Sequence, residues 1–510
     1  MRYGPHLTAL TLLMCLVTQR SSGQPFEVNY GGSGQSGTAI GTTTDGGFIL
    51  GGSSYVEDEA GAGSTDALLV RTDGAGDTLW TRTFGGPGSD FLRDVTQTAD
   101  GGFMGIGTCN DLGPGGLDVF VIRTNVNGDL VWARAYGGIG DDQGTALVLV
   151  PNEGALLVGG AATTTGQRGF AIRIREDGSV IWTRAFGPEM LQGIAGACAT
   201  RGGGFALVGT ALGSIAVAIG MMEIDDSGNT MSNKVVDPGI SWANAIAPAV
   251  DHGYIVTGSV GADAFLLRMD SLWNMQWMTA YGDAAYIDKG YCVEQLLNGD
   301  FVFSGYSYLN TWLVRTNDQG ALVWQHRYGV SDFLKDQTQF ATLNEDGFAV
   351  SSRISDLNGY SAMQLLRTGP DGVLPCHDSS PPIQVWEVSY AVSSPTGTST
   401  SFGSMTEIEL SAGAGFAVYH PCLLQGVGSS EDRTAITVFP DPATDELFLK
   451  SNVRWQWIDI IDMQGRRLQR IPGNAFQDGK IDLRSCAAGT YLLSCVMQDG
   501  SSTTVPFIKE

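Results

Sequence analysis

The sequence predicts an all-β protein in which a seven-bladed β-propeller is followed by a small C-terminal β-sandwich. Three observations lead to this prediction. A Gly-rich unit recurs about every fifty residues, and each copy divides into short apolar runs separated by turn residues. The chain has 71 Gly and only 16% charged residues, and no stretch shows the spacing of an amphipathic helix. Residues 434–510 alternate apolar residues with turn signals.

Residues 1–23 have the layout of a secretory signal peptide. Arg2 precedes an apolar run from Leu7 to Val17, and small residues follow up to Gly23. The run is too short to span a bilayer, and no later run approaches that length. We therefore expect an exported protein whose mature chain starts at Gln24 and has no transmembrane segment.

Three landmarks recur in each unit of the expected propeller, residues 24–375. They are a turn resembling D-G-G-F, an apolar strand that ends in Arg, and a Trp nine residues after that Arg. The turns close at Phe48, Phe103, Leu156, Phe205, Tyr254, Phe301 and Phe348. The Trp residues are Trp80, Trp132, Trp182, Trp277 and Trp324. Four strands per unit is the size of a propeller blade, and we expect each Trp to fill the wedge between two blades.

The missing strand of the last unit predicts how the ring closes. Cys376 stands where the seventh Trp is expected, so the fourth strand of that unit is absent. Before the first turn, "PFEVNYGG" matches the end of a fourth strand, with Phe26 in the place of Trp80. We therefore expect Phe26–Tyr30 to complete the seventh blade, which leaves no open edge between the chain ends.

Residues 376–425 are expected to form a β-hairpin-like extension, and 426–433 a polar linker. Cys376 and Cys422 flank the extension, each beside a His. A disulfide between them is the simpler interpretation for an exported protein, and a metal site with His377 and His420 is the alternative.

The candidate binding residues lie on the propeller face that carries the longer, more variable loops. They are Asp90, Asp111, Asp142, Asp283, Tyr306 and Tyr308. Such carboxylates are candidate Ca²⁺ ligands or the acid and base of a glycosidase, but an acidic protein also scatters Asp over its surface. The net charge of −24 argues against nucleic acid as a partner. On the opposite face, Gly102 and its counterparts are expected to need a backbone conformation that side chains penalise.

Residues 434–510 resemble the type A C-terminal sorting domain of the type IX secretion system of Bacteroidota. The opening "VFPDP" matches the V-Y-P-N-P pattern of that family, and D-x-x-G-R, I-D-L and G-x-Y follow in order. The matched positions are Pro440, Pro442, Asp462, Gly465, Arg466, Gly489, Tyr491 and Lys509. The resemblance implies passage through the periplasm and across the outer membrane by the type IX machinery, then release or attachment at the cell surface.

These patterns together favour an exported, non-enzymatic propeller that binds a glycan or a surface protein. No nucleophile motif is present and no catalytic residue is assigned. No cofactor is expected, with Ca²⁺ the one candidate. The alternative is a secreted glycan-active hydrolase that uses carboxylates of the loop face. Buried carboxylates at the channel mouth would favour the enzyme, and scattered exposed ones would favour binding.

Overall fold

The computed structural model contains two compact units, Met1–Gly426 and Val427–Glu510. It describes residues 24–419 except 32–33, 58–62, 165, 215, 284, 330–333, 343–346, 356–360, 376–377, 397–398, 401–403, 408–410 and 414–417. In the C-terminal unit it describes 437–509 except 440–445, 451–454, 463–466, 473–479, 485, 488 and 498–501. The expected signal peptide lies outside these residues. The described residues are all strand and loop, and none of them form a helix that is long and apolar enough to cross a membrane.

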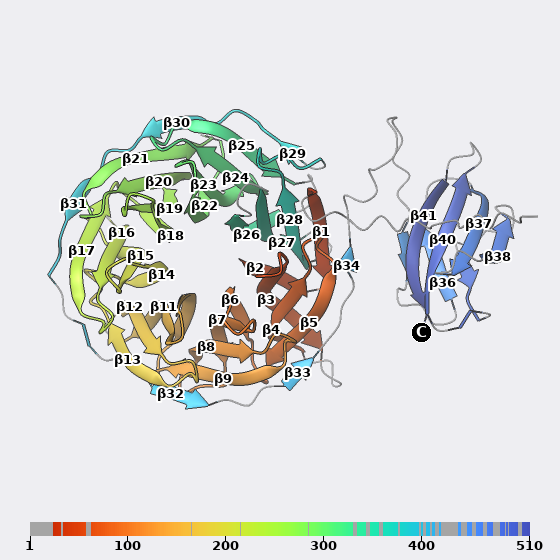
Figure 1. Ribbon diagram of the computed structural model, residues 1–510, viewed down its shortest axis with the longest axis horizontal. Coiled ribbons are helices and arrows are strands. Elements are labelled where there is room, and N and C mark those ends of the chain that lie inside the picture. The colour runs from red at the N-terminus through yellow and green to blue at the C-terminus, as the bar shows by residue number, and fades with distance from the viewer. Residues whose placement is uncertain are drawn as a thin grey trace, which may run out of the picture. The chain divides into compact units, whose positions relative to one another are not determined.

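The first unit is a ring of seven antiparallel sheets, as the repeats predict (Figure 1). Blade 1 contains β2 (Gln35–Thr42), β3 (Phe48–Glu57), β4 (Gly63–Thr72) and β5 (Thr78–Gly85). Blade 2 contains β6 (Phe91–Gln97), β7 (Phe103–Asn110), β8 (Leu117–Thr124) and β9 (Leu130–Gly137). Blade 3 contains β10 (Asp142–Val150), β11 (Gly154–Thr163), β12 (Gly166–Ile174) and β13 (Val180–Ala185). Blade 4 contains β14 (Gly193–Ala199), β15 (Phe205–Leu212), β16 (Val217–Ile224) and β17 (Thr230–Asp237).

The remaining blades follow the same order, with the first strand of each at the centre of the ring. Blade 5 contains β18 (Ser241–Pro248), β19 (Tyr254–Val260), β20 (Asp263–Met269) and β21 (Met275–Gly282). Blade 6 contains β22 (Asp288–Gln295), β23 (Phe301–Ser307), β24 (Asn310–Thr316) and β25 (Leu322–Tyr328). Blade 7 contains β26 (Leu334–Thr342), β27 (Phe348–Ser355), β28 (Ser361–Thr368) and the N-terminal β1 (Phe26–Gly31).

The N-terminal strand closes the ring, as the sequence predicts. β1 pairs antiparallel with β28, from Phe26 opposite Arg367 to Gly31 opposite Ala362. Both faces of β1 are buried. Its apolar side chains pack with residues of blades 1 and 7 in a single cluster. A strand from one end of the chain thus completes a sheet built from the other end of the propeller.

Each Trp landmark packs on the next blade, which confirms its expected place. The Trp132 Nε1 donates a hydrogen bond to the Glu176 carbonyl of blade 3 at 3.0 Å. Gly178, in the same turn, has φ +80 and lies so close that a Cβ there would meet the Trp132 ring at 3.3 Å. Trp80 and Trp182 make the same contacts with Gly128 and Gly228. The fourth strands therefore bind the blades to one another through repeated aromatic contacts.

The D-G-G-F turns are tied to the Arg landmarks, and the roles of their two Gly residues differ. In blade 2, Arg123 Nη2 lies 2.6 Å from Asp100 Oδ1 of the turn. Gly101 has φ +83, whereas Gly102 is not among the residues with positive φ. A Cβ on Gly102 would instead lie 2.2 Å from the Thr124 carbonyl oxygen. The expectation of an unusual backbone is therefore wrong at Gly102, where close packing excludes a side chain, but it is confirmed at its counterpart Gly347, which has φ +111.

Residues 376–425 do not form the expected hairpin-like extension. Their described strands run around the rim of the ring and add a fifth strand to six of the blades (Figure 1). In chain order they are β29 (Asp378–Ser379) on blade 6, β30 (Gln384–Glu387) on blade 5, β31 (Ala391–Ser393) on blade 4, β32 (Ser404–Glu407) on blade 2, β33 (Ser411–Gly413) on blade 1 and β34 (Val418–Tyr419) on blade 7. On blade 3, Thr400 forms a single bridge with Ala185.

This segment, residues 378–419, is here termed the rim belt. The edge strands of the blades offer unpaired backbone groups, and the belt satisfies part of them in every blade. Side chains add to the pairing on blade 6, where Asp378 Oδ1 lies 2.9 Å from His326 Nδ1. The segment forms no hairpin because the outer strands of the seven blades offered open edges, and the belt strands pair with those edges and not with each other.

The C-terminal unit is a small β-sandwich, as predicted. One sheet contains β35 (Thr437–Phe439), β36 (Glu446–Lys450) and β39 (Lys480–Asp482). The other contains β38 (Arg467–Pro472), β37 (Trp455–Asp462), β40 (Gly489–Met497) and β41 (Ser502–Lys509). Leu447, Ile458 and Leu493 contribute to one core shared by both sheets. The Tyr491 and Phe507 rings stack with centroids 5.7 Å apart.

Candidate binding sites on the propeller

A pocket of about 350 Å³ lies on the loop face, where the inner strands of blades 3, 4 and 5 begin. Gln143 of β10, Gln192 before β14 and Trp242 of β18 contribute to it from three different blades. The position of these residues at the loop end of the first strands places the pocket beside the channel mouth. This is the face on which the sequence predicts ligand binding.

The pocket is lined by neutral hydrogen-bonding groups, one exposed indole and one carboxylate, that of Asp141. Trp242 is 41% exposed, although it belongs to a residue type that is usually buried. Among the described residues, the side-chain amides of Gln143, Gln167 and Gln192 form no hydrogen bond within the protein. Asn244, by contrast, donates its amide to the Gly290 carbonyl at 2.7 Å. The three Gln side chains are therefore available to a ligand, whereas Asn244 holds the wall in place.

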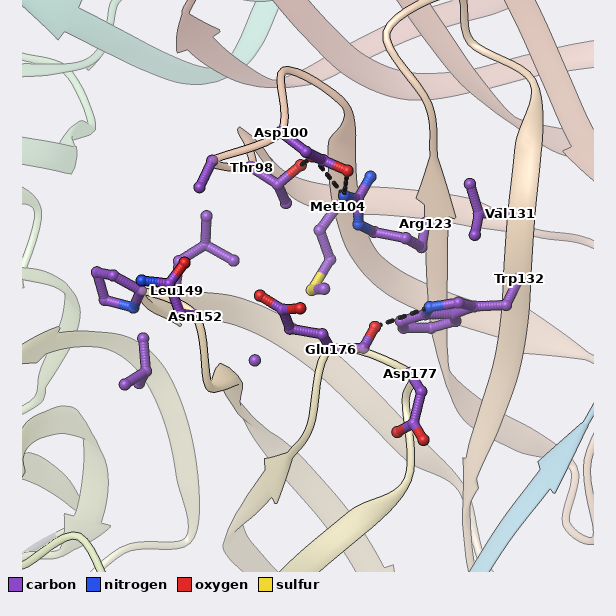
Figure 2. Close-up of a pocket in the computed structure, with 14 residues that line it drawn as sticks. Thr98, Asp100, Met104, Arg123, Val131, Trp132, Leu149, Asn152, Glu176 and Asp177 are labelled. Carbon is purple, nitrogen blue, oxygen red and sulfur yellow. Dashed lines mark hydrogen bonds and ion pairs between the residues drawn. The ribbon is translucent and has the colours of Figure 1, made fainter.

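A second, larger pocket of about 670 Å³ lies on the opposite face, between the turns of blades 2 and 3 (Figure 2). Its apolar wall includes Met104, Leu149 and Trp132. Figure 2 shows the Glu176 side chain extending toward Met104, whereas the Asp177 side chain points away. The Asp100 carboxylate at its rim already binds Arg123. The sequence did not predict a pocket on this face.

Beside the second pocket, an aromatic contact that other blade junctions make is absent. Trp80 contacts Phe103 of the next blade with ring centroids 5.6 Å apart, and Trp277 contacts Phe301 at 5.9 Å. In blade 3, Ala155 occupies the position that Phe103 has in blade 2. The two positions correspond because each residue pairs, in its own sheet, with the residue that follows the landmark Arg. Trp132 therefore has no ring opposite it. The sequence predicted Leu156 as the closing residue of this turn, which is one position too far along the chain.

The structure places the predicted Asp residues in different environments. Asp90 and Asp142 are buried, at 0% and 2% exposure. Asp111 is exposed with φ 66, and Asp283 is half-buried. None of the four lines either pocket, although Asp141, the neighbour of Asp142, lines the smaller one. Asp90 and Asp142 are therefore buried, whereas Asp111 is exposed, and a ligand-binding role for the four residues stays a prediction.

The two predicted Tyr residues lie beyond the pockets. Tyr308 is 50% exposed and has φ 47. Its ring centroid lies 3.9 Å from that of Tyr286, so the two form an aromatic pair on the loop face of blades 5 and 6. Tyr306 is half-buried in β23. Sequence reasoning did not single out Trp242 and the Gln residues of the smaller pocket, because these residue types are common in loops and strands alike.

Burial and charge divide the carboxylates into two electrostatic classes. Desolvation raises the pKa of both Asp90 and Asp142 to about 6. In contrast, the hydrogen bond from Thr98 helps to lower the pKa of Asp100, at the rim of the larger pocket, to about 2. The Ser179 hydrogen bonds lower the pKa of Asp177. Of these four carboxylates, the two with a raised pKa, Asp90 and Asp142, are thus the buried ones.

Several predicted residues lie outside the described part of the chain. These are Cys376, Cys422, Pro440, Pro442, Gly465 and Arg466. The disulfide therefore remains a prediction. Asp462 pairs with Tyr491 in the sheet register, and the Tyr491 hydroxyl donates a hydrogen bond to the Ala487 carbonyl at 2.7 Å. Gly489 is exposed, and Lys509 is buried near the end of β41.

The fold and its appended sandwich define an exported propeller with a C-terminal secretion module. Residues 437–510 match the family model described as the secretion system C-terminal sorting domain. The chain therefore carries a type IX sorting domain, which directs it to secretion or to the outer surface. A crystal structure of a protein from Lactobacillus plantarum is similar at 14% identity, with a TM-score of 0.35 over 71% of this chain and 100% of that one. Comparison with curated proteins gives no match.

Proposed function

We propose that the propeller is a non-enzymatic binding module that recognises a glycan through the loop-face pocket. The observation that carries the proposal is the chemistry of the pocket lining. Three Gln amides and the exposed Trp242 ring combine donors, acceptors and an apolar face. Sugars present the same combination, with hydroxyl groups around the ring and C–H groups on its faces, and specific sites place a few polar groups beside apolar surface.

The volume of the pocket limits how many sugar rings of a glycan can bind in it. At about 350 Å³, the pocket is at the small end of ligand sites. It fits one or two terminal sugar rings and not an internal stretch of a polymer. The net charge of −24 disfavours polyanionic chains, so we expect a neutral or weakly charged glycan.

The distribution of carboxylates supports binding over hydrolysis. A glycosidase acid needs a carboxyl group with a raised pKa beside the scissile bond. Asp90 and Asp142 have the raised pKa but are buried away from both pockets. Asp100 and Asp177 line a pocket but have lowered pKa values. No described residue therefore combines a pocket position with a raised pKa.

The test is a screen of neutral oligosaccharides against the wild-type chain, followed by titration of the best ligand. Trp242→Ala should weaken binding at least tenfold, and Gln192→Ala by several-fold, with unchanged unfolding temperatures. Trp386→Ala is the matched control, since Trp386 is 38% exposed on the rim belt. Undiminished binding by Trp242→Ala, or release of reducing sugar by the wild-type chain, would overturn the proposal.

A further inference from the structure

Pairs of Asp residues recur at three junctions between neighbouring blades. In each junction one Asp is at the loop end of a third strand and the other starts the first strand of the next blade. The pairs are Asp66 with Asp90, Asp118 with Asp142, and Asp263 with Asp288. None of these six Asp residues lines either of the two pockets. Like charges this close require a compensating positive charge or a shared proton.

Each pair converges on a Gly of the fourth strand. A Cβ on Gly85 would lie 2.3 Å from Asp66 Oδ1 and 3.0 Å from Asp90 Oδ2. The corresponding distances at Gly137 are 2.0 Å to Asp118 Oδ1 and 2.8 Å to Asp142 Oδ2. The absence of a side chain on Gly thus leaves space for two carboxylates to approach the same point.

Some carboxylate oxygens in these pairs accept no hydrogen bond from the described part of the protein. Asp90 Oδ2 accepts a hydrogen bond from the Gly86 amide at 2.8 Å, and Asp142 Oδ2 accepts one from Gly138 at 2.6 Å. The Oδ1 atoms of Asp90 and Asp118 are buried and have no hydrogen-bond partner among the described residues, and the same holds for Asp263 and Asp288 of the third pair. Asp90, Asp118 and Asp288 are 0% exposed. Unpartnered buried carboxylate oxygens are costly, so something beyond the protein's own donors is expected at these points.

The charged groups around the first two pairs are acidic. Asp111 acts on Asp90, and Asp141 acts on both Asp118 and Asp142. The neighbouring Cys109 carries no charge, because burial raises the pKa of its thiol. The third pair differs, since the positive charge of Arg327 in β25 acts on Asp288, although burial still keeps the pKa of Asp288 above its ordinary value. Only that pair has a guanidinium among these described neighbours.

Blades 2 and 3 have another residue at the position that Arg327 occupies in blade 6. Arg327 is three residues after Trp324, and the matching positions in blades 2 and 3 are Ala135 and Ala185. Both Ala residues are buried. The position of Asp90 is occupied by Gln35 at the junction of blades 7 and 1, where the amide bonds Ser54 at 3.1 Å. An uncharged residue therefore suits the fold, and the two Asp pairs without an Arg lack their counter-charge.

We propose that Asp66 with Asp90, and Asp118 with Asp142, each bind one Ca²⁺ ion at the loop face of the propeller. Ca²⁺ takes six to eight oxygen ligands, which carboxylates, backbone carbonyls and waters supply together. Among the described residues, no group of three or more His, Cys, Asp and Glu side chains is placed to hold a metal, so backbone carbonyls and waters would have to supply the remaining ligands. With two carboxylates per ion, we expect weak sites with Kd of roughly 10⁻⁴–10⁻³ M, as in extracellular modules.

The test is calorimetric titration of the wild-type chain with CaCl₂, which should show two ions per chain. Asp90→Asn and Asp142→Asn should each lose one ion, and their unfolding temperatures should respond less to CaCl₂. Arg327→Ala should gain a third ion, because it removes the counter-charge of the third pair. Asp177→Asn and Asp225→Asn, at exposed carboxylates of the turn face, are matched controls that should bind like the wild type.

The pH dependence separates Ca²⁺ from a shared proton. The folded pKa values of Asp90 and Asp142, about 6, exceed the unfolded value of about 3.9, so without Ca²⁺ stability falls as pH rises from about 4 to 6. Excess CaCl₂ should suppress this fall in the wild type. If the fall is the same with CaCl₂ and with EGTA, and no heat of binding is measured, the pairs share protons and the proposal is wrong.

Discussion

The Tyr30 hydroxyl donates a 2.7 Å hydrogen bond to the Gly76 carbonyl, which joins the N-terminal strand to the first blade. Tyr136 and Gly178 form the same bond between blades 2 and 3. Near Tyr30, a Cβ on Gly76 would lie 2.7 Å from the Phe26 ring, which stands in the place of a Trp. The N-terminal strand therefore repeats the Tyr–carbonyl and ring–Gly contacts that link the other blades, without the hydrogen bond that a Trp donates there.

Deletion of residues 24–30 should destabilise the whole ring. The deletion exposes β28 and removes the contacts of Phe26 and Tyr30 with blade 1, so we expect a large fall in unfolding temperature. Differential scanning calorimetry measures it. Deletion of residues 434–510, which belong to the other compact unit, is the control and should leave the propeller transition in place. Equal transitions for the wild type and the N-terminal deletion would show that β1 does not close the ring.

Ala155→Phe should fill part of the turn-face pocket and stabilise the propeller. It restores opposite Trp132 the ring that Phe103 provides opposite Trp80. Cavity filling of this kind yields about 0.5–2 kcal/mol. Urea unfolding measures the gain, with Ala155→Leu expected to lie between the wild type and Ala155→Phe. A destabilised Ala155→Phe variant with a normal Ala155→Leu variant would mean that the backbone around Ala155 is too close for a ring.

Removal of the rim belt should increase self-association. A chain that ends at Pro375 leaves the outer strands of all blades with open edges, which pair readily with other chains. Static light scattering should show concentration-dependent aggregates, whereas a chain that ends at residue 433 should stay monodisperse. If the shorter chain is as monodisperse as the longer one, the belt has no protective role at these edges.

Removal of residues 434–510 should stop export without unfolding the propeller. The sorting domain directs the chain to secretion or the outer surface, so the truncated chain should accumulate in the periplasm of a host with type IX secretion. Immunoblots of cell fractions measure it, with the intact chain as the reference. Truncated protein in the medium or on intact cells would contradict this role.

The sequence predicted the ring because the landmarks repeat, and each Trp landmark has its partner in the next blade. Trp80 and Gly128 are an example, since the ring and the turn that receives it recur in fixed positions. The rim belt could not be predicted in the same way. Its strands are two to four residues long, and β30 is exposed along its whole length, so neither period nor apolar pattern marks them. Their positions depend on the edges that they cover.

The sites were predicted less well than the ring, for a related reason. A pocket depends on which blade departs from the repeat, and the loss of one ring at Ala155 is only evident once the register places it opposite Trp132. Likewise, Asp90 resembles any loop carboxylate in the sequence. The structure shows that it is 0% exposed and faces Asp66.

The central claim is that the loop face binds a glycan. Hydrogen exchange of the wild-type chain, with and without the best oligosaccharide from the screen, tests it most directly. We expect protection in the peptides that contain Gln143, Gln192 and Trp242, and no change around Met104 and Asn152 on the turn face. Protection confined to the turn-face peptides would contradict the account.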